Sequence, residues 1–167
     1  MEQRNDLSLL IDGYRPGAIG RVAELHGTYY HRHWGFGLFF EAKVATGLSE
    51  FLSRLDPDRD GFWGAYEAGR LVGSIAIDGS EDPAQGAHLR WFMVDPKAHG
   101  LGLGRILLGK ALDFCREKEF SRVYLWTFAG LDAARRLYEQ AGFTICREVD
   151  NDQWGKVMKE QMMELVY

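Results

Sequence analysis

Hydrophobic residues recur along this chain with two spacings, one typical of helices and one typical of strands. Apolar side chains three or four positions apart predict four helices, and short apolar runs between turn residues predict seven strands. The first helix follows the turn at 15–17, and the other three cover about 38–55, 103–115 and 134–141. The strands cover 7–11, 62–68, 71–77, 88–94, 122–127, 143–149 and part of 155–167. The predicted order is β-α-α-β-β-β-α-β-α-β-β, which indicates an α/β (α+β) domain with helices packed on a mixed sheet.

Two local signals sharpen this topology. The run 88–94 is almost continuously apolar, which is typical of a central strand covered on both faces. Gly142 follows the last predicted helix and is well placed for the left-handed backbone that ends helices. Since no repeat, charge block or linker divides the chain, we expect one domain over 6–167.

The composition is that of a folded protein without a strong electrostatic field. Of the 167 residues, 46% are hydrophobic and 26% are charged, and the net charge is −4. This acidic balance disfavours nucleic acid as the main partner. Cys115 and Cys146 lie in apolar contexts and are expected to be buried free thiols, as in a reducing compartment. With no evident signal peptide or membrane span, we expect a cytoplasmic protein that does not bind membranes.

Three alternating glycines, Gly100, Gly102 and Gly104, lie between the predicted central strand and the helix that follows it. Glycines let a ligand approach the backbone closely, and the free N–H groups at a helix N-terminus attract phosphate. The pattern favours a phosphate or pyrophosphate site, and a tight turn whose glycines serve only packing is the alternative. A P-loop fits worse because Arg105 follows Gly104, and a dinucleotide site fits worse because the next strand ends without an acid.

Two stretches of the chain match the motifs of one superfamily. The stretch 99–104, His-Gly-Leu-Gly-Leu-Gly, is similar to a pyrophosphate loop R/Q-x-x-G-x-G/A, with His99 in the first position. The stretch 134–143 meets the pattern A-x-x-L-Y-E-x-x-G-F in full. By these motifs the chain resembles the GNAT superfamily of acyl-CoA-dependent N-acetyltransferases, and more narrowly the acetyltransferase half of fusions with MarR-type regulators. It departs from many relatives at Leu131, where they carry Asn.

The resemblance implies a fold, a co-substrate and a set of contacts. The implied fold is a mostly antiparallel central sheet, splayed between strands 4 and 5 and flanked by about four helices. The implied co-substrate is acetyl-CoA, without a metal. Tyr138 takes the position of the acid that protonates the departing thiolate, and simple packing of its ring is the alternative. The implied cofactor contacts are Phe92, Met93, Val94, His99, Gly100, Leu101, Gly102, Leu103, Gly104, Arg105, Thr127 and Ala134.

No motif fixes the general base. The segment 88–94 contains no carboxylate, so the strand that carries the base in many relatives lacks one. Glu41 is preferred because it adjoins the aromatic-rich stretch 28–40, which is expected to form an acceptor-pocket wall, a homodimer contact or a helix–helix core. The alternatives to Glu41 are Glu24, His26, His88 and water.

The sequence therefore predicts an N-acetyltransferase that carries an acetyl group from acetyl-CoA to a primary amine of a small molecule or protein, by direct attack in a ternary complex. The alternative is a non-catalytic acyl-CoA-binding regulatory module. Arg90 can bind an acceptor carboxylate or form an ordinary salt bridge. His31 and His33 lack a third metal ligand, so no metal is expected. The identity of the acceptor amine does not follow from the sequence.

Overall fold

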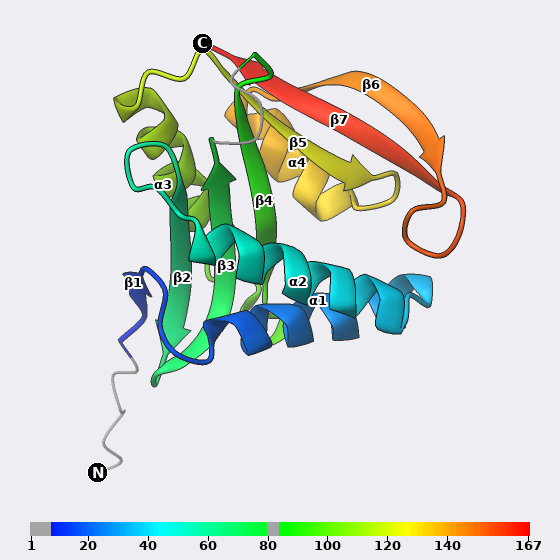
Figure 1. Cartoon of the computed structure of the whole chain (residues 1–167), viewed down its shortest axis with the longest axis horizontal. Coiled ribbons are helices and arrows are strands. Elements are labelled where there is room, and N and C mark those ends of the chain that lie inside the picture. The colour runs from blue at the N-terminus through cyan, green and yellow to red at the C-terminus, as the bar shows by residue number, and fades with distance from the viewer. Residues whose placement is uncertain (1–7, 80–83) are drawn as a thin grey trace.

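A computed structural model of the protein describes residues 8–79 and 84–167. Their strands form one sheet in the order β1-β2-β3-β4-β5-β7-β6, with helices on both faces (Figure 1). A short 3-10 helix at Pro96–Ala98 precedes α3. In chain order the other elements are β1 (Leu10–Asp12), α1 (Ala18–Trp34), α2 (Leu38–Ser53), β2 (Gly61–Glu67), β3 (Arg70–Asp78), β4 (Ala87–Val94), α3 (Leu103–Glu117), β5 (Arg122–Phe128), α4 (Asp132–Ala141), β6 (Thr144–Asn151) and β7 (Met158–Val166).

The sheet opens in its middle. Neighbouring strands are antiparallel except β4 and β5, which run parallel and pair only at Ala87 with Val123 and at His88 with Tyr124. Beyond these two pairs the strands diverge, so one edge of β4 faces an opening instead of a partner. The predicted fold class is confirmed, including the splay between strands 4 and 5.

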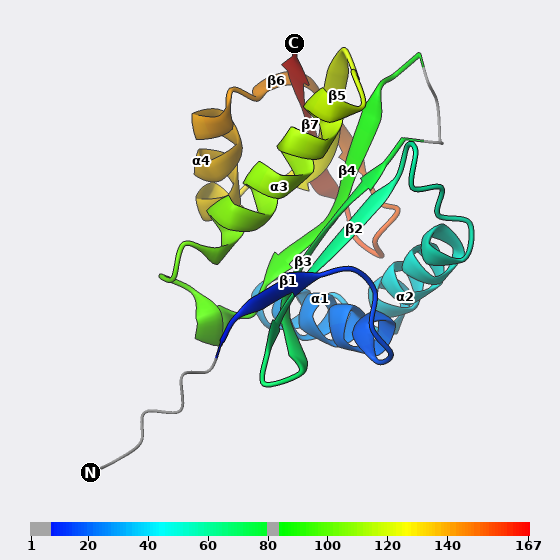
Figure 2. The same cartoon turned by 90° about the vertical axis from the view of Figure 1, so that its left-hand side faces the viewer.

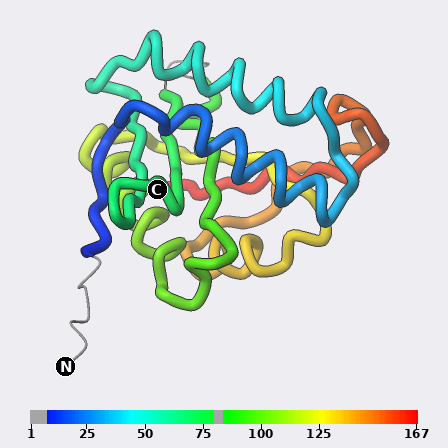
Figure 3. The backbone as a smooth tube through the Cα atoms, turned by 90° about the horizontal axis from the view of Figure 1, so that it is seen from below, coloured from blue at the N-terminus to red at the C-terminus, as the bar shows by residue number. Residues whose placement is uncertain are grey.

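Two helical layers enclose the sheet. Figure 2 shows α3 and α4 on one face and α1 and α2 on the other, and Figure 3 shows α1 and α2 lying side by side. On the α3 face, Leu107, Ala111 and Cys115 are fully buried against Ile75, Ile77 and other strand residues. On the α1 face, Val22, Leu48 and Phe51 form a second core. Helical spacing of these apolar residues explains why each helix buries one side.

A bulge bends β4 beside the opening. Between Ser74 and Ala76 of β3 the pairing shifts, so that β4 carries one extra residue. Trp91 lies in this bulge with a φ of 47°, which is uncommon for a non-glycine residue, and the Ser74 hydroxyl donates a hydrogen bond of 2.7 Å to the Trp91 carbonyl. The sequence pattern of 88–94 gave no sign of this bulge.

The structure corrects the predicted ends of two elements and the burial predicted for the strand at 88–94. The first strand is Leu10–Asp12 rather than 7–11, of which residue 7 lies outside the described part of the chain, and the second helix ends at Ser53 rather than at 55. Gly142 has a φ of 104° and ends α4, as predicted. The β4 strand is central, but Arg90, Trp91 and Phe92 are only partly buried because the opening lies beside them.

The prediction for the two cysteines is right for one and wrong for the other. Cys115 is buried in α3, and burial raises the pKa of its thiol to about 12. Cys146 is exposed. It lies on the edge strand β6 where the register with β7 shifts between Ile145 and Arg147, so the alternation that would turn it inward is broken.

Candidate active-site cleft

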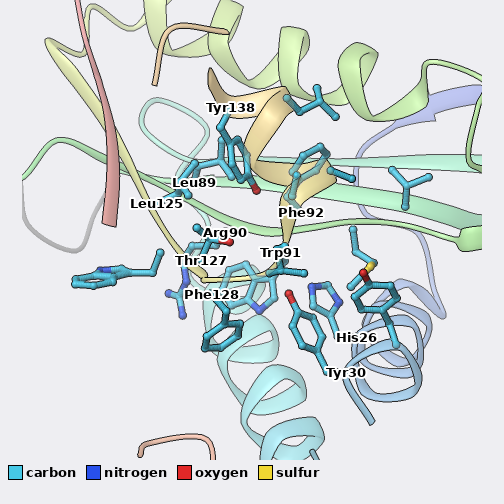
Figure 4. A pocket seen from close by; sticks show the side chains of 18 of the residues that line it. His26, Tyr30, Leu89, Arg90, Trp91, Phe92, Leu125, Thr127, Phe128 and Tyr138 are labelled. Atoms are coloured by element: carbon cyan, nitrogen blue, oxygen red, sulfur yellow. The ribbon is translucent and has the colours of Figure 1, made fainter. Parts of the chain in front are cut away.

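The opening between β4 and β5 is a cavity of 1230 Å³ with two differently built halves. Figure 4 shows Tyr138 and Phe92 on one side of it and Tyr30, His26 and Phe128 on the other. We call the first side the glycine-loop half, lined by Phe92, Val94, Ala98, His99, Gly100, Gly102, Leu103, Gly104, Arg105, Ala134, Leu137 and Tyr138. We call the second side the aromatic half, lined by His26, Tyr29, Tyr30, Phe40, Lys43, Val44, Trp126, Phe128, Arg147, Trp154 and Glu160.

The glycines of the loop have different roles. Gly100 and Gly102 have φ values of 85° and 71°, and a side chain at either would meet no atom within 4 Å. Gly102 is the N-cap of α3, which carries no side-chain cap and no acid in its first turn, so its N–H groups and positive dipole end are open to an anion. A side chain on Gly104 would come within 3.2 Å of Leu137, so this glycine permits the close approach of α3 and α4.

The other residues of the loop that were predicted to contact the cofactor differ in whether their side chains line the cavity. Arg105 is exposed at the cavity wall, and its guanidinium donates to the Gln140 amide oxygen at 3.2 Å. His99 Nε2 lies 3.1 Å from the carbonyl oxygen of Val94, to which it donates. The Leu101 side chain is 70% exposed and is not part of the cavity wall, so only its backbone can contribute there.

The β4 strand offers main-chain groups to the cavity. Beyond His88 it has no pairing with β5, so N–H and C=O groups along this edge are available to an extended, amide-containing ligand. The side chains of Phe92 and Val94 pack toward α3 and α4, whereas Met93 is buried in the core beneath α1. Thr127 on β5 is buried and lines the opposite wall.

Tyr138 lies at the centre of the glycine-loop half. Its ring is 6% exposed and packs against Phe92 and Phe143, with centroids 5.9 and 5.8 Å apart. Burial, with a smaller contribution from the phenol of Tyr30, raises the pKa of Tyr138 well above its usual range. Figure 4 shows its hydroxyl directed into the space between the strands. This group is therefore a protonated donor that faces the cavity.

Glu41 and Glu24 lie outside the cavity wall. Glu41 is exposed on α2, and its carboxylate packs against the backbone of Gly27 on α1. Glu24 forms ion pairs with Arg21 at 2.9 Å and with Arg70 at 3.8 Å. The packing of α1 against α2 turns Glu41 away from the cavity, and ion pairs hold Glu24 away from it, so the structure does not bring the preferred base to the site.

Both candidate histidines line the cavity. His26 is buried, and its Nδ1 donates a hydrogen bond of 2.8 Å to the Val22 carbonyl. Burial lowers the pKa of His26 to about 4, against a smaller opposing effect of that hydrogen bond. His88 is partly buried and stacks on Tyr124 with ring centroids 4.6 Å apart.

The aromatic half is assembled from distant segments. Tyr30 on α1 stands 4.8 Å from Phe40 on α2 and 5.9 Å from Phe128 on β5, measured between ring centroids. Trp154, in the turn between β6 and β7, closes the cluster at 5.4 Å from Phe40. The richness of 28–40 in aromatic residues indicated part of this wall, but no sequence signal pointed to Trp154.

Two charged residues of the cavity wall are Arg90, for which a salt bridge was one of two expectations, and Glu160, which the sequence did not indicate. Arg90 forms an ion pair of 3.2 Å with the fully buried carboxylate of Asp78, which also binds Arg54 at 2.7 Å. The salt bridge that was one reading of Arg90 is thus present. Glu160, which no motif singled out, is buried on β7 in the aromatic half.

The part of the chain that the structure describes holds neither a cluster of metal ligands nor a membrane-spanning helix. Within 8–79 and 84–167, no group of three or more His, Cys, Asp or Glu side chains is arranged to hold a metal ion. In the same part of the chain, no helix has both the length and the apolar character needed to cross a membrane.

Comparisons with solved structures agree with this architecture. The ribosomal-protein-alanine N-acetyltransferase of Brucella melitensis superposes with a TM-score of 0.75 at 17% identity, over 95% of this chain and 99% of that one. An acetyltransferase of Salmonella typhimurium, solved with its cofactor acetyl-CoA, gives a TM-score of 0.74 at 17% identity, over 95% and 93% of the two chains. At these identities the likeness shows the fold.

Sequence comparisons add the family. Human N-acetylaspartate synthetase is 30% identical over 81% of this chain and 43% of its own length, and the mycothiol acetyltransferase of Geodermatophilus obscurus is 36% identical over 52% and 30%. The chain thus spans about half or less of the length of such curated relatives. The model of the acetyltransferase (GNAT) family, whose acyl donor is acetyl-CoA, matches residues 20–143. This match covers most of the chain, including the glycine loop and Tyr138, and the protein belongs to the GNAT family of acetyltransferases.

Proposed function

We propose that the protein is an N-acetyltransferase that transfers an acetyl group from acetyl-CoA to a primary amine of a small molecule or a protein. The observation that carries this proposal is a single cavity that joins the glycine loop, the unpaired edge of β4 and the Tyr138 hydroxyl to the aromatic half. Its 1230 Å³ exceeds the roughly 300–1,000 Å³ of an ordinary small-molecule site, so two substrates can meet in it.

The glycine-loop half fits the donor. Main-chain N–H groups at the start of α3 would hold the pyrophosphate, and Gly100 and Gly102 leave the space for its approach. The amide groups of the pantetheine arm would pair with the edge of β4 at Phe92, Met93 and Val94. Ala134 and Arg105 line the remaining wall of this half, and Thr127 lies on the opposite wall of the cavity.

Direct transfer needs one proton taken from the amine and one given to sulfur. The amine nitrogen attacks the thioester carbonyl, the C–N bond forms, and the C–S bond breaks. Tyr138 would donate its phenolic proton to the departing thiolate and regain one afterwards, because its raised pKa favours the protonated phenol. For the proton of the amine, Glu41 lies outside the wall and His26 is a weak acceptor, so we assign it to His88 or water.

The acceptor is proposed only as a class. The names of similar proteins include small-molecule acetyltransferases and a ribosomal-protein-alanine acetyltransferase, which is why both kinds of amine are kept. The narrower resemblance to acetyltransferase halves of MarR-type fusions and the homodimer stay predictions.

A turnover assay tests this proposal directly. The protein is incubated with acetyl-CoA and, in turn, spermidine, tyramine, an amino acid and a peptide with a free α-amine, and the released thiol is measured. We expect amine-dependent release of CoA and an acetylated product seen by mass spectrometry. Binding of acetyl-CoA without such release from any amine would instead indicate the non-catalytic acyl-CoA-binding module.

A further inference from the structure

Glu160 is a buried acid in the wall of a largely aromatic cavity. Glu160 is 3% exposed, lies near the turn end of β7 and lines the aromatic half. Its Oε1 accepts a hydrogen bond of 2.7 Å from the Gln153 amide and another from the Trp154 indole N–H. Both donors are neutral, so neither balances the charge of a carboxylate.

The second oxygen of Glu160 has no hydrogen-bond donor within the described part of the chain. Among the described residues, no group donates to Oε2, and no side-chain nitrogen or oxygen that is sealed from solvent lacks a partner. Oε2 is therefore not sealed from solvent, and the cavity is the open space that Glu160 lines. An oxygen in this situation is ready to accept a hydrogen bond from a bound molecule.

No cation of the described chain is paired with Glu160. Lys43 lies over the ring of Trp154 at 4.8 Å and Arg147 lies 6.0 Å from the ring centroid of Trp126, and neither forms an ion pair with this carboxylate. A buried carboxylate without a counter-ion is destabilising, and a ligand that brings a positive charge removes that cost. The arrangement favours a cationic ligand over a neutral one.

The rings around Glu160 suit the same ligand. Phe128 is its direct cross-strand partner on β5, and the Phe128 and Trp154 rings are 6.0 Å apart in an edge-to-face arrangement. Aromatic faces attract ammonium groups, and the attraction grows when water is excluded. Phe40 and Tyr30 extend the apolar wall beyond this point.

From these observations we infer that Glu160, with Phe128 and Trp154, forms the site that binds the ammonium group of the acceptor, and that the acceptor is a cationic amine on an apolar or aromatic body. The statement that the bound amine is the acceptor rests on the proposed function. Binding of the amine at this site can be measured without turnover. Glu160 is here a binding residue, separate from Tyr138 and the glycine loop.

The test measures binding of a matched pair of probes to the full chain saturated with CoA. The probes are 2-phenylethylammonium and 2-phenylethanol, which share a body and differ in the charge. We expect ligand-observed NMR to give at least about tenfold tighter binding of the ammonium, the advantage of roughly 1.4 kcal/mol that a charge-assisted contact provides. Glu160→Gln, which keeps an acceptor for Gln153 and Trp154, should abolish that preference.

The control is Glu148→Gln. Glu148 is next to Val149, the β6 partner of Glu160, so it points to the opposite face of the sheet, where it accepts a 2.9 Å hydrogen bond from Gln161. This variant should keep the full preference for the ammonium. Equal binding of the two probes to the wild type, no binding of the ammonium, or an unchanged preference in Glu160→Gln would each overturn the inference. The wild-type comparison does not depend on a variant folding. If the ammonium binds but no amine releases CoA from acetyl-CoA in the turnover assay, only the proposed function is refuted.

Discussion

The two halves of the cleft are built in different ways. The glycine-loop half comes from two short stretches, 92–105 and 134–138, within each of which the lining residues lie close together in the sequence. The aromatic half joins Tyr30, Phe40, Phe128 and Trp154, which belong to three different elements and to the turn between β6 and β7. A site made from contiguous residues can be found as a motif, whereas a site made by folding cannot. The first half is where the family resemblance lies, and the second is where we propose that the acceptor binds.

The largest effect is expected from the hydroxyl of Tyr138. Tyr138→Phe keeps the ring that packs against Phe92 and Phe143 and removes only the donor. Because general acid catalysis contributes about 10²- to 10⁴-fold, kcat should fall by that order while acetyl-CoA affinity stays near wild type. Steady-state kinetics and calorimetry measure the two quantities.

The same variant also tests whether Tyr138 acts as an acid or only positions the donor. Full kcat in Tyr138→Phe would show that water or another side chain supplies the proton. A normal kcat with weakened acetyl-CoA binding would make Tyr138 a positioning residue of the donor site instead of an acid.

A smaller effect, on stability, is expected in the aromatic half. The pKa of His26 is lowered to about 4 from an ordinary value near 6.5, so the unfolded chain binds its proton more readily than the folded one. The resulting stability is present above pH 6.5 and is lost as the pH falls toward 4, by up to about 3 kcal/mol. Urea unfolding at pH 7, 5.5 and 4.5 should show this decline.

Two variants test whether His26, in the aromatic half, causes the loss of stability at low pH. His26→Asn, which can still donate to the Val22 carbonyl, should give a shallower dependence on pH than the wild type. His99→Asn, at an exposed position of the glycine-loop half, should follow the wild-type curve. An equal slope in His26→Asn and the wild type would contradict the assignment.

The smallest effect is expected from removing metals. Neither half needs a metal for the proposed transfer, so turnover should be the same before and after treatment with EDTA. Activity that disappears with the chelator and returns with a divalent ion would mean that a metal takes part.

What the sequence predicts well is what short segments determine. Periodic apolar residues predict the order of helices and strands, and the resemblance carried by the motifs at 99–104 and 134–143 together implies the fold with its splay. The bulge at Trp91 escaped because it depends on register with β3, and Glu160 escaped because its burial depends on the turn that carries Trp154. Glu41 was preferred for being near the aromatic stretch in sequence, yet the packing of α1 against α2 turns it outward.

The most direct test of the account is the affinity of acetyl-CoA for the wild type and for Gly102→Val, measured by titration calorimetry. Valine is strained at a φ of 71°, by about 1–2 kcal/mol or more, and would place its side chain where the pyrophosphate approaches the first turn of α3. Gly109→Val, at a position of the same helix with open space around it, is the matched control. We predict that Gly102→Val loses binding while its circular dichroism spectrum is retained and that Gly109→Val binds normally. Unchanged affinity in Gly102→Val would contradict the assignment of the loop to acetyl-CoA.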